Sequence, residues 1–251
     1  MSKQKTKDKI VYPESDGKPM CDNTLQYYWI TVIQENLDKI LPCFVAADLL
    51  WYPVEGEPKI SAAPDVMVMF GRPKGHRGSY KQWEEGNIAP QVVFEILSPS
   101  NTKKEMAEKL LFYQKHNVQE YYLYYPQRNS LRGWQRLGEQ LVDIVPMSNW
   151  TSPLLGIRFE QSDQELTLYH ADGQRFLSFL ELNQRYEDVL VAESQANAQI
   201  QQANAQIQQA NAQIERERQQ RLLAEQHLEQ ERLRAEQLRA KLRALGIDPN
   251  I

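Results

Sequence analysis

The sequence has no uncharged apolar stretch near the roughly 20 residues that a membrane-spanning helix needs. Its charged N-terminus, MSKQKTKDKI, is not followed by the apolar segment that a secretory signal contains. Only two of the 251 residues are cysteines, Cys21 and Cys43, and their spacing fits neither a disulfide framework nor a metal cluster. We therefore expect a cytoplasmic protein with free thiols and no membrane segment.

A surplus of positive charge is also lacking, because 29 Lys and Arg face 33 Asp and Glu, for a net charge of −4. Proteins that hold nucleic acid through overall charge carry many more cations, so that class is excluded, although a local basic patch is not. Apolar residues at 41% and charged residues at 25% are ordinary globular values and exclude disorder of the whole chain.

Aromatic residues are absent from residue 191 onward, where the chain also holds a single glycine and a single proline. The motif QANAQIQ occurs at 195–201 and again at 202–208, and QANAQI follows at 209–214. With the isoleucines of this repeat at heptad position a, eleven of the fourteen a and d sites between residues 200 and 245 are apolar. This period of seven predicts a coiled coil that pairs two copies of the chain, with a solitary helix or a Gln-rich linker as the alternatives.

The change in composition predicts a division into a body, 1–190, a heptad-repeat helix, 191–246, and a short tail, 247–251. Gly246 and Pro249 supply the signal that ends the helix. In the body, helices are expected at 24–40, at 103–117 and from about 174. Strands are expected at 44–52, 65–70, 92–97, 120–125, 131–136, 140–145, 154–159 and 165–169. This order predicts an α/β fold with a mixed central β-sheet flanked by helices.

Two carboxylates in the body could carry chemistry. Glu95 interrupts the apolar run 92–97, where a carboxylate is costly unless it is paired, protonated or bound to a cation. Asp65 follows a proline and opens the strand 65–70, and strand ends are where sites collect in α/β folds. If the two strands are neighbours, the pair describes a Mg²⁺ site that activates water against phosphodiesters. A structural salt bridge for Glu95 and a turn role for Asp65 are the alternatives.

A lysine is the third candidate. Thr102 and Glu105 match a capping box, so the helix 103–117 begins directly after Thr102. Lys109 lies almost two turns into this helix, near the face that packs on the sheet. It either extends to solvent and pairs with Glu105, or it points at the two acids and stabilises charge on a reacting phosphate.

Weaker candidates surround this set. Asp48 interrupts another apolar strand and is a third candidate metal ligand. A Gly-rich loop after the strand 65–70 carries basic residues that could contact backbone phosphates, although a solvated loop explains them equally well. These residues are Arg72, Lys74, Arg77 and Lys81.

The ordered combination of motifs resembles the Uma-type putative restriction endonucleases, a bacterial family of the PD-(D/E)XK nuclease superfamily. The motifs are Pro64-Asp65, the run FEILSPS at 94–100, Lys109 with Tyr113, VQEY at 118–121, and Tyr125-Pro126. The resemblance spans roughly 44–180 and implies a restriction-endonuclease-like fold. It further implies Asp65 and Glu95 as metal ligands and Lys109 as the catalytic cation.

One position departs from the superfamily pattern. The superfamily places a lysine two residues after the second acid, on the same strand, and this chain has Leu97 there. The Uma-type pattern instead carries the lysine on the following helix, which corresponds to Lys109. We therefore expect replacement of Lys109 to abolish cleavage with little change in stability.

The resemblance implies an endonuclease that uses Mg²⁺, with Mn²⁺ as a substitute, and that acts on DNA. The seven-residue repeat predicts that it does so as a homodimer. Two-fold symmetry of a dimer would match the pseudo-symmetry of duplex DNA. The alternative is a catalytically inactive protein of the same fold that acts through its helical tail. The acidic body favours this alternative mildly, whereas the set of two acids and a lysine favours the enzyme.

Overall fold

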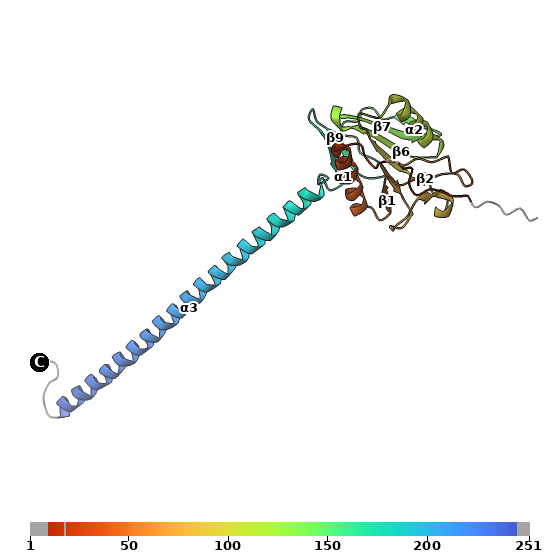
Figure 1. Cartoon of the computed structure of the whole chain (residues 1–251). Coiled ribbons are helices and arrows are strands. Elements are labelled where there is room, and N and C mark those ends of the chain that lie inside the picture. Colours follow the sequence, from red (N-terminus) through yellow and green to blue (C-terminus); the bar gives the residue numbers. More distant parts are fainter. Residues whose placement is uncertain (1–9, 18, 245–251) are drawn as a thin grey trace, which may run out of the picture. The chain divides into compact units, whose positions relative to one another are not determined.

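The computed structural model describes residues 10–17 and 19–244. It divides between Leu182 and Asn183 into two units, which are described separately below. The first unit is an α/β structure with a mixed sheet flanked by helices, which confirms the predicted fold class (Figure 1). Within the described ranges, no helix combines the length and the apolarity that crossing a membrane requires.

A six-stranded mixed sheet forms the centre of the first unit, in the order β1–β3–β5–β6–β7–β8. Strands β5 and β6 are parallel, and the other neighbours are antiparallel. The strands are β1 (Phe44–Ala47), β3 (Val66–Met69), β5 (Val92–Ile96), β6 (Glu120–Tyr125), β7 (Ser130–Leu137) and β8 (Gln140–Asp143).

Two small sheets and two short 3₁₀ helices complete the strand-rich part of the unit. The small sheets pair β2 (Trp51–Tyr52) with β4 (Tyr80–Lys81), and β9 (Arg158–Gln161) with β10 (Leu166–Tyr169). The 3₁₀ helices are η1 (Gln82–Glu85) and η2 (Pro126–Arg128).

Each face of the central sheet is covered by a helix. Helix α1 (Thr24–Ile40) begins at Asn23, whose side chain accepts a hydrogen bond from the backbone N–H of Gln26. Its apolar face packs with Phe94 and with the β9–β10 pair. Helix α2 (Lys103–Lys115) connects the parallel strands β5 and β6 and contributes Tyr113 to the core of the opposite face.

Alternation along β5 determines which face each of its side chains reaches. Val92, Phe94 and Ile96 belong to the core on the α1 side, whereas Val93 belongs to the core on the α2 side. Because successive side chains of a strand point to opposite faces, Glu95 points to the α2 side.

The sequence did not predict β4, and three of the expected elements are divided, shortened or shifted for a visible physical reason. Asp48 has a positive φ of 48°, which ends β1 and divides the expected strand 44–52 into β1 and β2. Gly156, with φ of 68°, lies within the expected strand 154–159, and β9 begins only at Arg158. The helix expected from about 174 begins at Phe179, because Ser178 and Glu181 exchange hydrogen bonds of the capping-box type.

The capping box predicted at the start of α2 is confirmed. The Thr102 side chain accepts the backbone N–H of Glu105, and the Glu105 side chain accepts the backbone N–H of Thr102. The helix therefore begins at Lys103, and the position of Lys109 along it follows from this start.

Helix α3 (Phe179–Ala244) has 66 residues and forms the second unit from Asn183 onward. At 1.5 Å per residue it is about 100 Å long. None of its residues is buried, and the side chains of Ile200, Ile207 and Ile214 are between 57% and 62% exposed. The predicted helix stop at Gly246 and Pro249, and the predicted tail 247–251, lie outside the described residues.

Candidate active site

Asp65 and Glu95 come from neighbouring strands and share one face of the sheet. Strands β3 and β5 pair antiparallel with Val66 opposite Phe94. One residue further along, Asp65 therefore lies opposite Glu95, and residues directly opposite each other point to the same face. That face is the one that α2 covers.

Glu95 is only 2% exposed, and both of its carboxylate oxygens accept hydrogen bonds from α2. Lys109 Nζ donates to Oε2 at 2.6 Å, and the Tyr113 hydroxyl donates to Oε1. These partners explain how a carboxylate is accommodated in an otherwise apolar strand. Of the two orientations that the sequence left open for Lys109, the structure has the one directed at the acids.

Asp65 is 9% exposed, and its Oδ2 accepts the backbone N–H of Ile96 at 2.6 Å. Burial raises the pKa of Asp65 well above its ordinary value of 3.8, and the charge of Glu95 raises it further, while Lys109 opposes the shift. Burial lowers the pKa of Lys109, but the charges of Glu95 and Asp65 outweigh this effect, so its pKa is raised. The site therefore holds a protonated ammonium in contact with Glu95 and within the field of Asp65.

The raised pKa of Asp65 predicts that Asp65→Asn stabilises the metal-free protein at pH 8. The folded state binds this proton more tightly than the unfolded state, so the contribution of Asp65 to stability falls as pH rises above 3.8 toward the raised value. Asparagine removes this penalty and keeps an oxygen for the Ile96 N–H.

We expect the melting temperature of Asp65→Asn in a chelator to exceed that of the wild type at pH 8. The difference should shrink as the pH falls toward 4, where Asp65 is protonated in the folded wild type. Equal melting temperatures at pH 8, measured by calorimetry, would contradict the electrostatic description of Asp65.

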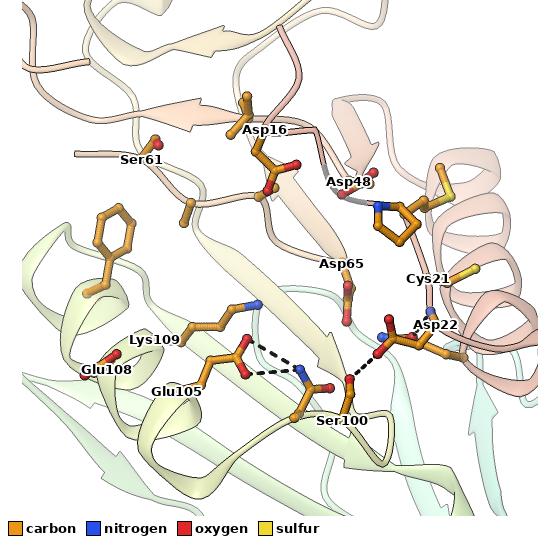
Figure 2. Close-up of a pocket in the computed structure, with 18 residues that line it drawn as sticks. Asp16, Cys21, Asp22, Asp48, Ser61, Asp65, Ser100, Glu105, Glu108 and Lys109 are labelled. Carbon is orange, nitrogen blue, oxygen red and sulfur yellow. Dashed lines mark hydrogen bonds between the residues drawn. The ribbon is translucent and has the colours of Figure 1, made fainter. Parts of the chain in front are cut away.

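Asp65 and Lys109 line a cavity of about 660 Å³, whereas Glu95 is not among the described residues that line it. Figure 2 shows the Lys109 side chain extending from α2 toward Asp65. Five further acids line the same cavity, namely Asp16, Asp22, Asp48, Glu105 and Glu108. Because these carboxylates would repel a phosphate group, a polyanionic substrate requires cations at this site.

Asp48, the third candidate ligand, belongs to this electrostatic environment. Burial raises the pKa of Asp48, the charges of Asp16 and Glu95 raise it further, and Lys109 opposes the shift. Asp48, which ends β1, therefore places a third acidic side chain within electrostatic range of Lys109 and Glu95.

The side chains present fit a hard divalent cation. Asp65 and Glu95 offer carboxylate oxygens on one face, and such oxygens are the ligands that Mg²⁺ and Mn²⁺ prefer. Within the described part of the chain, no group of three or more His, Cys, Asp or Glu side chains forms a complete metal cage. An ion held here would thus complete its coordination with water, as Mg²⁺ commonly does.

The segment that precedes α1 also lines the cavity, which the sequence did not reveal. The Ser98 hydroxyl donates to Asp22 Oδ2 at 2.5 Å, and the Ser100 hydroxyl donates to the same oxygen. Hydrogen bonds from Ser100 and Ser98 lower the pKa of Asp22. Since 76 residues separate Asp22 from Ser98, no local pattern could indicate this contact.

The four basic residues predicted to contact DNA are not among the described residues that line the cavity. Three of them are paired with acids: Lys74 with Asp38 at 3.2 Å, Arg77 with Glu85 at 2.6 Å, and Lys81 with Glu84 at 3.4 Å. The Nε of Arg72 donates to the carbonyl of Gly71. Their contact with DNA stays a prediction, and it would require phosphates to compete with these acids.

Comparison with known proteins gives one family. Residues 23–168, more than half of the chain, match the family described as Uma2, putative restriction endonuclease, and this range includes Asp65, Glu95 and Lys109. The crystal structure of a putative nuclease belonging to DUF820, from Anabaena variabilis ATCC 29413, is similar at 22% identity, with a TM-score of 0.36. That similarity covers 53% of this chain and 72% of the other. No curated protein matches the chain.

Proposed function

The chain belongs to the Uma2 family of putative restriction endonucleases, and on this basis we propose that it is a divalent-metal-dependent endonuclease that hydrolyses DNA phosphodiester bonds. The observation that carries the proposal is the meeting of Asp65, Glu95 and Lys109 on one face of the sheet. Two acids and an ammonium beside a cavity are the groups that metal-assisted hydrolysis of a phosphodiester requires.

Each of these side chains has a distinct task in the proposed reaction. Asp65 and Glu95 would hold the ion, Mg²⁺ or Mn²⁺, through their carboxylate oxygens. When bound, the ion supplies the positive charge that activates water and neutralises phosphate. The ammonium of Lys109, which contacts Glu95, would offer a fixed positive charge to the phosphate oxygens.

We also propose that α3 joins two copies of the chain into a homodimer. The seven-residue repeat and the exposed isoleucines at one heptad position support this assignment. A dimer would bring two such sites to the two strands of a duplex. The body, 1–190, would then be the nuclease domain and 191–246 the dimerising helix.

A catalytically inactive binding protein of the same fold is the second candidate. Two observations favour it: six acids and one cation, Lys109, are among the described residues that line the cavity, and three of the loop cations are paired with carboxylates. Such a protein would keep the fold and the helix without cleaving DNA.

Incubation of supercoiled plasmid with the purified protein distinguishes the two candidates. With Mg²⁺ or Mn²⁺ we expect nicked and linear DNA, and with a chelator we expect none. Glu95→Gln, which keeps the size of the side chain and removes its charge, should lower the rate by at least about 100-fold. Glu139→Gln removes an exposed charge in the β7–β8 turn and should cleave at the wild-type rate. If the wild type leaves the plasmid intact with both ions, the inactive alternative is correct.

A further inference from the structure

Helix α2 presents two hydrogen-bond donors to Glu95, one turn apart. Lys109 and Tyr113 are four residues apart, which places them on the same face of the helix. Lys109 contacts one carboxylate oxygen of Glu95 and Tyr113 contacts the other. Tyr113 is the buried residue of α2 and is 0% exposed.

The two donors differ in charge, and this difference gives them different effects on a metal ligand. Lys109 brings a full positive charge that competes with a cation for Glu95. The phenol of Tyr113 is neutral and protonated near pH 7, so it fixes one oxygen without cancelling the carboxylate charge. Each carboxylate oxygen has a second lone pair, and therefore Glu95 can accept both donors and still offer electron pairs to an ion.

Packing fixes the ring of Tyr113. It makes edge contacts with Tyr121, at 5.0 Å between centroids, and with Phe112, at 5.9 Å. The hydroxyl is consequently held in place by the core and not by Glu95 alone, as a group that orients a metal ligand must be.

We propose that Tyr113 is a positioning residue of the metal site, which holds the Glu95 carboxylate in the orientation that ligates the divalent ion opposite Asp65. The role rests on the proposed metal-dependent function. Partners of this kind, which hydrogen-bond to a ligand and do not touch the ion, are worth about 10–100-fold in metal affinity.

Titration calorimetry of the full chain with Mn²⁺ tests the role directly. Tyr113→Phe keeps the ring and deletes the hydroxyl, and we expect its dissociation constant for Mn²⁺ to rise by about 10–100-fold. The same factor should appear in the Mn²⁺ concentration that gives half-maximal plasmid cleavage, while the rate at saturating Mn²⁺ recovers most of the wild-type value. A purely structural role would not produce this recovery.

Tyr121→Phe is the matched control. Tyr121 is 0% exposed, lies on the same face of the sheet and contacts the Tyr113 ring, but its hydroxyl has no hydrogen-bond partner among the described residues. This variant should bind Mn²⁺ with the wild-type dissociation constant. Thermal melting in a chelator verifies that both variants are folded.

Three outcomes would overturn the inference. Unchanged Mn²⁺ binding in Tyr113→Phe would show that Lys109 alone orients Glu95. Equal weakening in Tyr113→Phe and Tyr121→Phe would assign the effect to a loosened aromatic core. Absence of Mn²⁺ binding in the wild type would refute the proposed metal-dependent function itself, and the positioning role with it.

Discussion

Lys109→Met should lower the rate of plasmid cleavage by about 100–1,000-fold and leave Mn²⁺ binding intact. The ammonium stands 2.6 Å from Glu95 and within the field of Asp65, so its removal deletes the fixed positive charge available to a phosphate at this site. Removal of the ammonium also makes the net charge of the site more negative, and this change does not weaken cation binding. Single-turnover cleavage and Mn²⁺ calorimetry on the same preparation measure the two effects.

The buried ion pair with Glu95 leads us to expect that the same substitution destabilises the metal-free protein, whereas the sequence alone led us to expect little change in stability. The Glu95 side chain is 3% exposed, and loss of its cationic partner leaves a buried carboxylate uncompensated. Breaking such a pair costs about 3 kcal/mol. Since a bound cation would neutralise the same carboxylate, Mn²⁺ should restore much of the lost stability.

Lys104→Met provides the control on the same helix. Lys104 is 86% exposed and pairs with Glu108 at 3.8 Å, and surface pairs of this kind are worth about 0–1 kcal/mol. This variant should keep wild-type cleavage and stability. Wild-type cleavage in Lys109→Met as well would mean that Lys109 is only the structural partner of Glu95.

Much of the candidate site was predictable because its two acids interrupt or precede runs of apolar residues. Glu95 stands out in a run of apolar residues, and Asp65 follows a proline at the start of another such run. Once the two strands are neighbours, an antiparallel register that brings Val66 opposite Phe94 also brings the acids together. The start of α2 was predictable for a similar reason, because Thr102 and Glu105 interact within a single helical turn.

The remaining features depend on contacts between distant residues or on backbone geometry. The bond from Tyr113 to Glu95 crosses 18 residues and the bonds to Asp22 cross more than 70, so neither leaves a periodic signal. Asp48 adopts a positive φ inside a sequence that otherwise resembles one continuous strand. Strand propensity alone does not indicate such a break, although Asp is among the few non-glycine residues that are enriched at positive φ.

Substituting the three isoleucines of the repeat with glutamate should convert a dimer into a monomer. Ile200, Ile207 and Ile214 share heptad position a, and each is more than half exposed in the single chain. Burial of a large apolar side chain contributes about 1–3 kcal/mol, so three such positions in each of two chains can account for a micromolar dimer. Glutamate keeps helix propensity while placing like charges across the seam.

The apolar seam also begins earlier than the boundary predicted at residue 190. Counting back in the same register passes Glu193 at position a and Ala196 at position d. It then gives Tyr186 and Phe179 at position a, with Val189 and Leu182 at position d. All four are between 44% and 64% exposed. Truncation after residue 190 would leave this part of the seam in place, and therefore substitution within the intact helix tests the pairing more cleanly.

A second triple variant supplies the matched control for the helix. Ala198, Ala205 and Ala212 lie at position f of the same heptads, on the side facing away from the seam. Their replacement by glutamate adds the same charge to the same stretch of helix. Light scattering at micromolar concentration should give twice the 29.3 kDa chain mass for the wild type and for this control. The isoleucine variant should give the mass of a single chain.

The pattern of masses separates the ways in which the helix could act. Dimers in all three proteins would place the interface outside the a positions, and the repeat would need another partner. Monomers in all three would make α3 a solitary helix or an adaptor for a different protein, and would remove the argument that two sites address two DNA strands together. Loss of the dimer in both variants would indicate that added charge, and not the apolar seam, separates the chains. Only loss confined to the isoleucine variant ties the dimer to the seven-residue period, because the two variants add the same charge to different faces of the helix and only one of them removes the apolar side chains at position a.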